Sequence, residues 1–259
     1  MPTLTVAILT LNEERPLVDC LRSAAFADQV LVVDSGSSDR TVALARELGA
    51  KVVIHADWQG LARQRDQQLA HATGDYLFLL DADERIPDGL REEIEGVVRD
   101  NRNLVGSIRW EHVAFGRRLE RMRAGERVQR MFRRDQVLGF EGVVHEHALL
   151  RQPAPPGRTF HTRVLHYSRE TIHGSLVKLA QYAQLGAVKR ARRGKRGGIF
   201  RGVLSGWANF LRYYLLEGGI WCGPQGFLFC LFIGLECFFR YVALRYDADN
   251  LGDIAKRGA

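Results

Sequence analysis

Cysteine is scarce in this sequence. The chain of 259 residues contains four cysteines, and three of them, Cys222, Cys230 and Cys237, lie in one apolar stretch near the C-terminus. No two cysteines form a C-x-x-C pair, so the spacing excludes the usual zinc-ribbon and redox motifs. We expect reduced thiols that pack as small apolar side chains, as is typical of a cytoplasmic protein.

Signals for export, repetition and disorder are also lacking. The opening residues, MPTLTVAILTLNEERP, have neither the basic start nor the small-residue cleavage site of a signal peptide, and we expect them to form the first strand of a domain. The sequence has no internal repeat and no low-complexity tract. Its 46% hydrophobic and 26% charged residues are ordinary for a globular protein, which excludes global disorder.

Acidic residues are outnumbered by basic ones. The chain has 37 Lys and Arg against 30 Asp and Glu, which gives a net charge of +7 and a pI near 9.5. Such a surplus indicates an anionic partner: a nucleotide, a phosphorylated lipid, a membrane face or a nucleic acid. The charge alone does not choose among these partners.

Strand and helix patterns alternate four times in the first 100 residues. β-Branched and apolar runs predict strands over residues 3–11, 29–34, 50–56 and 75–84. Helical spacing predicts helices between them, one of them N-capped by Asp39 and another opened by Pro87. This alternation predicts an α/β fold with a doubly wound, mostly parallel sheet.

Polar clusters follow three of these strands, at residues 10–13, 34–37 and 81–84. Because ligands of a doubly wound sheet bind beyond the carboxyl ends of its strands, we expect all three clusters on one edge. The third cluster holds Asp81, Asp83 and Glu84 directly after a buried strand. Carboxylates this crowded indicate a bound cation, and Mg²⁺ or Mn²⁺ suits a few carboxylate oxygens completed by phosphate and water. The alternative is a solvated acidic turn.

The pattern changes twice after residue 100. Strands with intervening loops are expected from about 104 to 167, and the chain is helical from 171 onward. Eight arginines occur within eighteen residues of the strand region: Arg117, Arg118, Arg121, Arg123, Arg127, Arg130, Arg133 and Arg134. Arginine binds phosphate and carboxylate bidentately, and Arg130 and Arg133 flank an apolar pair that would turn them inward. The alternative is a solvated basic face. Aromatic side chains are not interleaved with these arginines, as they would be in a protein that binds single-stranded nucleic acid, so we expect no nucleic-acid partner.

A second basic run, residues 189–201, lies directly before an amphipathic helical pattern. Basic clusters beside apolar helices are typical of attachment to an anionic membrane face. Residues 218–235 carry no charge, but glycines and Pro224 interrupt them, and Glu236 and Arg240 follow. We therefore expect an interfacial or shallow re-entrant element rather than a full crossing. The alternative is two helices packed on the protein or on a second subunit.

The motifs VAILTLNEE, VLVVDSGSSDRT and ARQRDQQLAHATGDYLFLLDADE, in this order, resemble the family-two glycosyltransferases of the GT-A fold over residues 3–100, and more weakly to about 167. The resemblance implies a nucleotide-sugar enzyme whose D-x-D motif binds ribose, diphosphate and metal through Asp81 and Asp83. Asp66 stands where the family usually has Asn. The implied donor-binding set is Thr10, Leu11, Glu13, Asp34, Ser35, Gly36, Arg65, Asp81, Ala82 and Asp83.

A narrower resemblance extends to the stretch FEGVVHEHAL. Together with LDADE it is similar to bacterial lipopolysaccharide inner-core glucosyltransferases, which share an F-x-G-x-V-H-E element. The resemblance implies UDP-glucose as donor and an acidic catalytic base in this element. We expect Glu146 as the base of an inverting transfer, with Glu141 as the second choice and His145 orienting the site. On the residues alone, a charged surface strand is the simpler interpretation.

These expectations combine into one hypothesis. Residues 1–168 form a GT-A catalytic domain, with a donor-binding half at about 1–100 and an acceptor half at about 101–168, and residues 169–259 form a helical membrane-associating region. The enzyme moves a hexose, with glucose the expected sugar, from a UDP-sugar to an anionic lipid-linked saccharide, with lipopolysaccharide core the expected acceptor. It uses Mg²⁺ or Mn²⁺ and acts at the cytoplasmic face of the membrane. Assembly into a homo-oligomer is compatible with this hypothesis.

Three alternatives stay open from the sequence. The same chemistry could act on a polyprenyl-phosphate-linked glycan. A non-enzymatic membrane scaffold could retain the nucleotide fold. A haloacid-dehalogenase-like phosphatase also carries D-x-D after an apolar strand, but there the motif closes the first strand, whereas here it closes the fourth and Glu84 follows.

Overall fold

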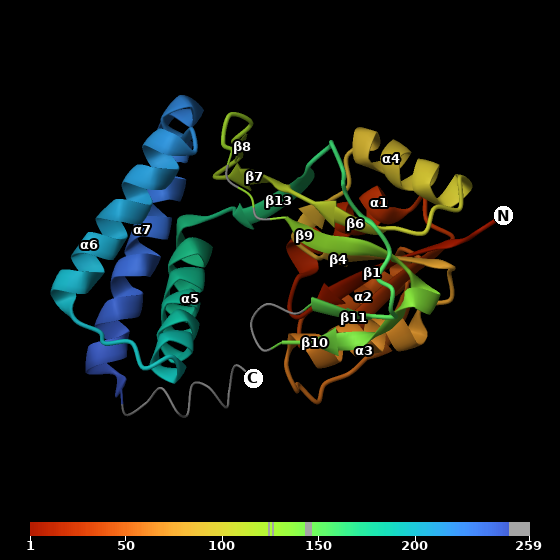
Figure 1. Ribbon diagram of the computed structural model, residues 1–259, viewed down its shortest axis with the longest axis horizontal. Helices are drawn as coiled ribbons and strands as arrows, with labels where there is room; N and C mark the ends of the chain where they lie inside the picture. Colours follow the sequence, from red (N-terminus) through yellow and green to blue (C-terminus); the bar gives the residue numbers. More distant parts are fainter. Residues whose placement is uncertain (124, 126, 143–146, 249–259) are drawn as a thin grey trace. The chain divides into compact units, whose positions relative to one another are not determined.

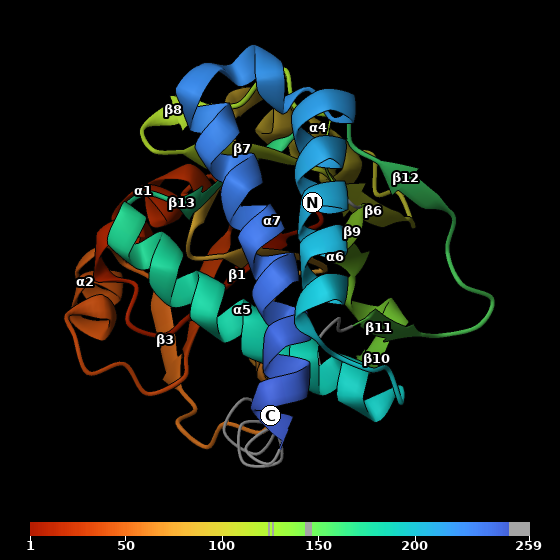
Figure 2. The same ribbon diagram turned by 90° about the vertical axis from the view of Figure 1, so that its left-hand side faces the viewer.

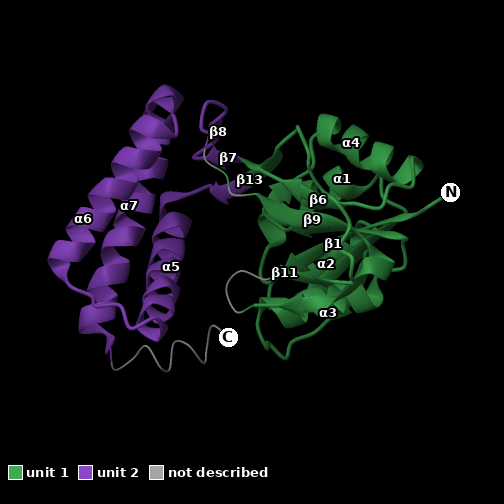
Figure 3. Ribbon diagram, in the orientation of Figure 1, with its two compact units in different colours: residues 1–110, 125–166 green, residues 111–124, 167–259 purple. Residues whose placement is uncertain are grey.

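A computed structural model describes residues 1–123, 125, 127–142 and 147–248 (Figure 1). The chain divides into two compact units (Figure 3). Unit 1 comprises residues 1–110 and 125–166, and unit 2 comprises residues 111–124 and 167–259. The chain therefore passes from unit 1 to unit 2 twice, within the strands β7 and β13.

Unit 1 is built on a seven-stranded sheet in the order β12-β6-β9-β4-β1-β2-β3. The strands β3, β2, β1 and β4 pair in parallel, whereas β9 runs antiparallel to both of its neighbours. The sheet strands are β1 (Leu4–Thr10), β2 (Gln29–Asp34), β3 (Lys51–Ile54), β4 (Tyr76–Asp81), β6 (Val105–Ile108), β9 (Val128–Arg133) and β12 (Gly157–Thr159). The helices are α1 (Glu14–Ala24), α2 (Thr41–Glu47), α3 (Leu61–His71) and α4 (Asp88–Arg99). The predicted α/β alternation and mostly parallel sheet are confirmed.

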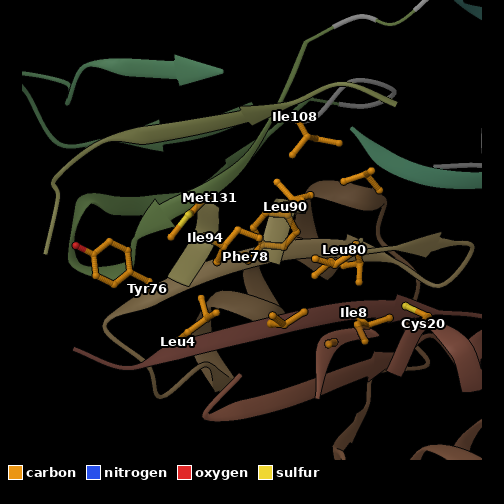
Figure 4. Close-up of a cluster of buried hydrophobic side chains, with 14 of the residues drawn as sticks. Leu4, Ile8, Cys20, Tyr76, Phe78, Leu80, Leu90, Ile94, Ile108 and Met131 are labelled. Carbon is orange, nitrogen blue, oxygen red and sulfur yellow. The ribbon is translucent and has the colours of Figure 1, made fainter. Parts of the chain in front are cut away.

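Alternate residues of the central strands supply two apolar layers. Leu4, Val6 and Ile8 of β1 pack with α1, α2 and α4 on one face, and Figure 4 shows Ile8 and Cys20 of this layer close to Leu80. Ala7, between them, packs with α3 residues on the other face. Because side chains of a strand alternate in direction, a strand buried on both faces reads as a continuous apolar run.

Short strands extend unit 1 beyond the main sheet. Strand β5 (Glu84–Arg85) pairs antiparallel with the first part of β13 (Val164–Arg169), so Glu84 faces His166 in register. Strands β10 (Val137–Glu141) and β11 (His147–Leu150) form an antiparallel pair that packs on α3. A 3₁₀ turn, η1 (Arg134–Gln136), connects β9 to β10.

The structure corrects one helix cap. Arg40, not Asp39, occupies the N-cap position of α2, and no side chain caps that helix end. Asp39 instead accepts hydrogen bonds from the backbone N–H and the hydroxyl of Thr41, and from the backbone N–H of Glu14. Its carboxylate therefore ties the starts of α1 and α2 together, which a cap predicted from one helix alone misses.

Unit 2 is mainly helical. Its elements are β8 (Arg117–Arg118), which pairs with the end of β7 (Trp110–Ala114), the helices α5 (Ile172–Arg192), α6 (Ile199–Leu211) and α7 (Gly223–Tyr246), the π-helical turn η2 (Arg212–Leu216) and the 3₁₀ turn η3 (Gly219–Cys222). Thr171 caps α5 by accepting the backbone N–H of Gly174. Buried within this unit, Arg169 pairs with Glu236 of α7, and its guanidinium lies over the rings of Phe229 and Phe232.

Helices α6 and α7 pack closely side by side (Figures 1 and 2). A Cβ added to Gly206 would lie 2.9 Å from the carbonyl oxygen of Gly234, and one added to Gly202 would lie 2.9 Å from that of Phe238. Contacts this short leave no room for a side chain at either position. Small residues that let helix backbones approach are typical of helix pairs that are not held together by a thick apolar core.

The C-terminal apolar segment is interrupted at its start, as expected, because Gly218 and Gly223 have φ +87° and +66° on either side of the short turn η3. Pro224 lies in the first turn of α7, where its missing N–H costs no hydrogen bond, and the helix then continues unbroken to Tyr246. Within the described part of the chain, one helical stretch, Gly219–Tyr246, is long and apolar enough to cross a bilayer by length and composition, with a mean hydropathy of 1.9. Of its glycines, Gly234 lies in close contact with α6, whereas Gly223 has φ +66° where η3 ends and α7 begins.

Candidate active site

The polar clusters meet at one edge of the sheet, as predicted. In the parallel register Thr10 of β1 lies opposite Asp34 of β2, and Leu9 of β1 lies opposite Asp81 of β4. The Thr10 hydroxyl donates to Asp34 Oδ2 at 2.8 Å. The carboxyl ends of three adjacent strands therefore bring residues from three distant parts of the sequence together.

Asp34 organises the loop that follows β2. Its Oδ1 accepts the backbone N–H groups of Gly36 and Ser37 at 3.0 and 2.8 Å, and its Oδ2 also accepts the Ser37 hydroxyl. Ser35 donates its backbone N–H to the carbonyl of Thr10. Gly36 has φ +95°, a left-handed conformation that favours glycine. Asp34 is fully buried, so its carboxylate shapes this loop from below.

The loop after β1 faces the loop after β2. Leu11 is 48% exposed, and the backbone N–H of Glu13 donates to the Thr41 hydroxyl at 2.8 Å. Asn12 links the two loops, since its backbone N–H donates to the Ser37 hydroxyl and its side-chain oxygen accepts the backbone N–H of Ser38. The predicted donor-binding loops are thus held against each other by the protein itself.

Two buried arginines hold Asp81. Arg65 of α3 contacts its Oδ1 at 2.7 Å and Arg130 of β9 contacts its Oδ2 at 2.5 Å. The arginine side chains are 2% and 5% exposed, whereas that of Asp81 is 36% exposed. Burial raises the pKa of Asp81, but the guanidiniums of Arg130 and Arg65 outweigh it and hold that pKa well below its usual range. Asp81 is therefore a fixed negative charge at the strand end.

Glu84 lies beneath this cluster and is almost fully buried. Its Oε2 accepts the backbone N–H of Asp81 at 3.0 Å, and its Oε1 accepts from Trp110 Nε1 and from Arg130 Nη2. Burial raises the pKa of Glu84 above its usual value, although Arg130 opposes that shift. Glu84 supports the turn that carries the D-x-D motif.

Asp83 and His166 form a pair that the sequence analysis missed. Asp83 Oδ2 lies 3.4 Å from His166 Nε2, and both side chains are mostly buried. The indole of Trp110 packs on the His166 ring with centroids 5.5 Å apart. Burial lowers the pKa of His166, but the Asp83 carboxylate outweighs it and raises that pKa. His166 reaches the site only because β13 pairs with β5, a contact that no local pattern in the sequence signals.

Ala82, between the two aspartates, is buried, and the site sequence also includes Asp66 next to Arg65. Asp66 Oδ1 accepts the backbone N–H of Phe140 at 2.9 Å. The departure from the family's usual Asn thus retains an acceptor, which fastens β10 to α3. Beyond Phe140, Glu141 Oε1 lies 2.8 Å from His147 Nε2 on the exposed face of the β10–β11 pair.

Two predicted catalytic residues, His145 and Glu146, lie outside the residues that the structure describes. The two arginines that were predicted to bind phosphate lie in different places. Arg130 is 4% exposed and reaches Asp81, whereas Arg133 pairs with Tyr76 in the register and so lies at the opposite end of β4. Arg133 donates to Asn101 there and is not brought to the D-x-D motif. Because β9 is antiparallel to β4, only the earlier arginine of the strand can reach this edge.

Comparisons with known proteins agree with this architecture. The family model described as glycosyl transferase family 2 matches residues 5–151. The lipopolysaccharide core biosynthesis glycosyltransferase LpsC of Rhizobium meliloti is 28% identical over 236 residues, which cover 87% of this chain and 85% of LpsC. An uncharacterized glycosyltransferase, RC0292 of Rickettsia conorii, is 26% identical and covers 92% and 88% of the two chains.

Among solved structures, glucosyl-3-phosphoglycerate synthase from Mycobacterium tuberculosis, determined with Mn²⁺, UDP and glucosyl-3-phosphoglycerate, overlaps this chain with a TM-score of 0.36 and 22% identity. The overlap covers 43% of this chain and 44% of that one, so the chain spans less than half of the solved protein. The family match covers more than half of the sequence and includes the whole sheet edge described above except His166. The chain is a glycosyltransferase and belongs to glycosyl transferase family 2.

Proposed function

We propose that this glycosyltransferase is metal-dependent and inverting, and that it moves a hexose from a UDP-sugar to an anionic lipid-linked saccharide of the lipopolysaccharide core type. The observation that supports it best is the Asp83–His166 pair beside Asp81, at the edge where β1, β2 and β4 end. LpsC, which aligns over most of the chain, is named as a lipopolysaccharide core biosynthesis enzyme, and this supports the acceptor class.

The residues at this edge fit a divalent cation that is shared with a diphosphate. Within the described residues, no three His, Cys, Asp or Glu side chains surround a common point as a closed metal site would. Asp83 and His166 offer one oxygen and one nitrogen donor 3.4 Å apart. A cation with two protein ligands keeps its other positions for phosphate oxygens and water, as Mg²⁺ does in phosphate-binding sites. When bound, the cation would stabilise the negative charge of the leaving diphosphate.

The protein's own groups have separate roles in this proposal. Asp81 and the loop shaped by Asp34 position the nucleoside and ribose, with Thr10, Glu13 and Gly36 lining the same edge. Arg65 and Arg130 hold Asp81 rigidly and contribute positive potential beside the diphosphate. In an inverting transfer the acceptor hydroxyl attacks the sugar on the face opposite the leaving diphosphate, and an acidic group of the protein takes the proton of that hydroxyl. Glu146 is the proposed base, and Glu141, paired with His147, is the second choice.

Unit 2 supplies the proposed membrane association. Its apolar helices carry basic residues nearby, and its long apolar helix Gly219–Tyr246 supports contact with a bilayer. A lipid-linked acceptor is confined to the membrane face. An enzyme that binds the same face therefore encounters its acceptor by diffusion along the membrane. We therefore place the enzyme peripherally on the cytoplasmic face, where nucleotide-sugars are made.

Nucleotide binding tests the donor site. Calorimetry would compare UDP, GDP, CMP and ADP with and without Mn²⁺ or Mg²⁺. We expect metal-dependent, UDP-selective binding that falls about 100-fold or more in Asp83→Asn and His166→Gln, since each removes a proposed ligand. Asp100→Asn, on the exposed end of α4, is the matched control and should bind normally. Full metal-dependent binding by Asp83→Asn would contradict the metal role.

A further inference from the structure

Unit 2 contains a hollow that the proposed chemistry does not use. Its cavity volume is about 440 Å³, and it is lined by Arg121, Arg123, Leu215, Leu216, Gly218 and Trp221. All six residues belong to unit 2. The hollow therefore joins two cationic side chains from the segment after β8 to apolar side chains from the turn between α6 and α7.

The two arginines are held in place by their backbone. The N–H of Arg123 donates to the carbonyl of Glu217 at 2.8 Å. Between the arginines, Met122 is buried in an apolar cluster with Cys222 and Phe229. Gly218 has φ +87°, and a Cβ there would lie 2.5 Å from the carbonyl oxygen of Arg121. The segment is thus clamped to the helical turn, and both arginines line the hollow beside that turn.

Among the residues that the structure describes, neither arginine side chain has an acidic partner. Arg121 and Arg123 are exposed, and neither forms an ion pair or side-chain hydrogen bond with any residue that the structure describes. Neighbouring charges differ, since Arg118 pairs with Glu111 and Arg212 pairs with Glu217. Two adjacent guanidiniums without a carboxylate are suited to phosphate, which they can bind bidentately.

The rim of the hollow is apolar and exposed. Leu215, Leu216 and Trp221 are 51%, 74% and 65% exposed. The same exposed character continues along α6 through a row of bulky side chains: Ile199, Phe200, Val203, Leu204, Trp207 and Leu211. Residues 202–211 include no charged residue. Exposed apolar faces of this size are typical of sites that bind a protein or a membrane.

Charge complementarity favours an anionic bilayer as that partner. Over its described residues unit 2 has sixteen Lys and Arg but only six Asp and Glu. A folded protein partner would have to match both a hydrocarbon-like face and a strong positive charge, whereas a bilayer with anionic lipids presents acyl chains and phosphates at adjacent depths. Tryptophan favours this boundary because its ring is apolar and its N–H is polar.

We propose that the Arg121–Arg123 hollow binds the phosphate of an anionic phospholipid while Leu216, Trp221 and the exposed face of α6 enter the bilayer interface. This proposal deepens the membrane partner of the proposed function and rests on it. It assigns the lipid contact to a defined pocket at the α6–α7 turn, in addition to the basic run at residues 189–201.

Vesicle binding tests the pocket. The full-length protein would be sedimented with two kinds of vesicle. One kind consists of phosphatidylcholine alone, and the other contains about 30% phosphatidylglycerol, an anionic lipid. We expect Arg121→Gln with Arg123→Gln to weaken binding to the anionic vesicles about 30-fold, since each basic residue at an anionic surface contributes roughly a fivefold change in partition. The matched control, Arg46→Gln with Arg99→Gln, removes two exposed arginines from α2 and α4 of unit 1 and should bind like the wild type.

Two further variants make the result decisive. Arg121→Lys with Arg123→Lys keeps the charge and should restore most of the binding, and Trp221→Ser should weaken binding to both kinds of vesicle. Equal binding by the glutamine pair and the wild type would overturn the proposal, as would an equal loss in the control pair. Calorimetry with UDP and metal on each variant reports unit 1 separately. If the glutamine pair binds both UDP and anionic vesicles like the wild type, the pocket proposal alone is wrong. If the wild type does not bind UDP, the donor-site proposal is wrong.

Discussion

The two units of this molecule use charge in opposite ways. Over the described residues, unit 1 has nineteen Lys and Arg against twenty Asp and Glu, whereas unit 2 has sixteen against six. The basic surplus of the sequence therefore belongs to unit 2. In unit 1 the buried charges are paired with one another, as in the Arg65–Asp81–Arg130 cluster. Unit 2 also contains the buried pair Arg169–Glu236, but exposed cations such as Arg121 lie beside exposed apolar side chains there.

This difference distinguishes a site from a surface. Paired buried charges cost desolvation and add little net stability, but they fix the geometry of a reaction centre. Unpaired cations beside apolar side chains gain little from the fold itself, and they create a surface potential that attracts external anions. The net charge of the whole chain conceals this division, because it averages a neutral unit with a strongly basic one.

The largest effect that sharpens the comparison is on the stability of unit 1. Arg130→Met removes the cation that contacts both Asp81 and Glu84, leaving Glu84 buried without its charged partner. Losing one partner of a buried pair costs about 3–5 kcal/mol, and partial exposure of Asp81 reduces this to about 2–3 kcal/mol. Urea unfolding would measure the loss. A second substitution, Glu84→Gln, should recover part of it, and no recovery would show that packing rather than charge determines the effect.

The sequence predicted the features that depend on local pattern. Strand and helix alternation, the shared edge of the three polar clusters and the inward position of Arg130 all follow from periodicity and from the parallel sheet it implies. Each of these needs only residues that are near in sequence, plus the rule that parallel strands end together. The Thr10–Asp34 hydrogen bond is a direct consequence of that rule.

Features that depend on distant pairing were not predicted. His166 lies 83 residues after Asp83, and Trp110 lies 26 residues after Glu84. The strand order β5-β13-β7 brings them together, and neither lies in a recognisable motif. The separation of Arg133 from the site has the same origin, because it follows from the antiparallel direction of β9. The close approach of Gly206 in α6 to Gly234 in α7 is likewise a pairing of distant residues, which a hydropathy pattern does not contain.

An intermediate effect concerns the packing of unit 2. Gly206→Ala would place a methyl group 2.9 Å from the Gly234 carbonyl oxygen, so α6 and α7 must move apart. Overpacking of this kind costs about 1–3 kcal/mol. Hydrogen exchange should accelerate in peptides from α6 and α7 and stay unchanged in β1 and β4. Gly157→Ala, where a Cβ meets nothing within 4 Å, is the matched control. Unchanged exchange in α6 would contradict the close packing.

The smallest expected effect concerns a partly buried carboxylate near the surface of unit 1. Glu93 of α4 accepts the backbone N–H groups of His161 and Thr162 at 2.9 and 2.8 Å. Partial burial raises the pKa of Glu93, but these donors outweigh it and lower that pKa. A carboxyl group whose folded pKa is lowered stabilises the fold above its unfolded pKa of about 4.3, and loses this contribution as the pH falls through the folded value.

Glu93→Gln should therefore reduce the free energy of unfolding by about 1 kcal/mol at pH 7, a value discounted for partial exposure, and the difference from wild type should shrink toward pH 3. Urea unfolding at several pH values measures it. A difference that persists unchanged at low pH would mean that the charge of Glu93 is irrelevant. The same series on Arg121→Gln should show no pH-dependent loss, because that side chain has no partner among the described residues whose loss could unfold unit 2. The proposal assigns the Glu93 charge to the fold and the Arg121 charge to a partner, and this pair of titrations separates the two uses.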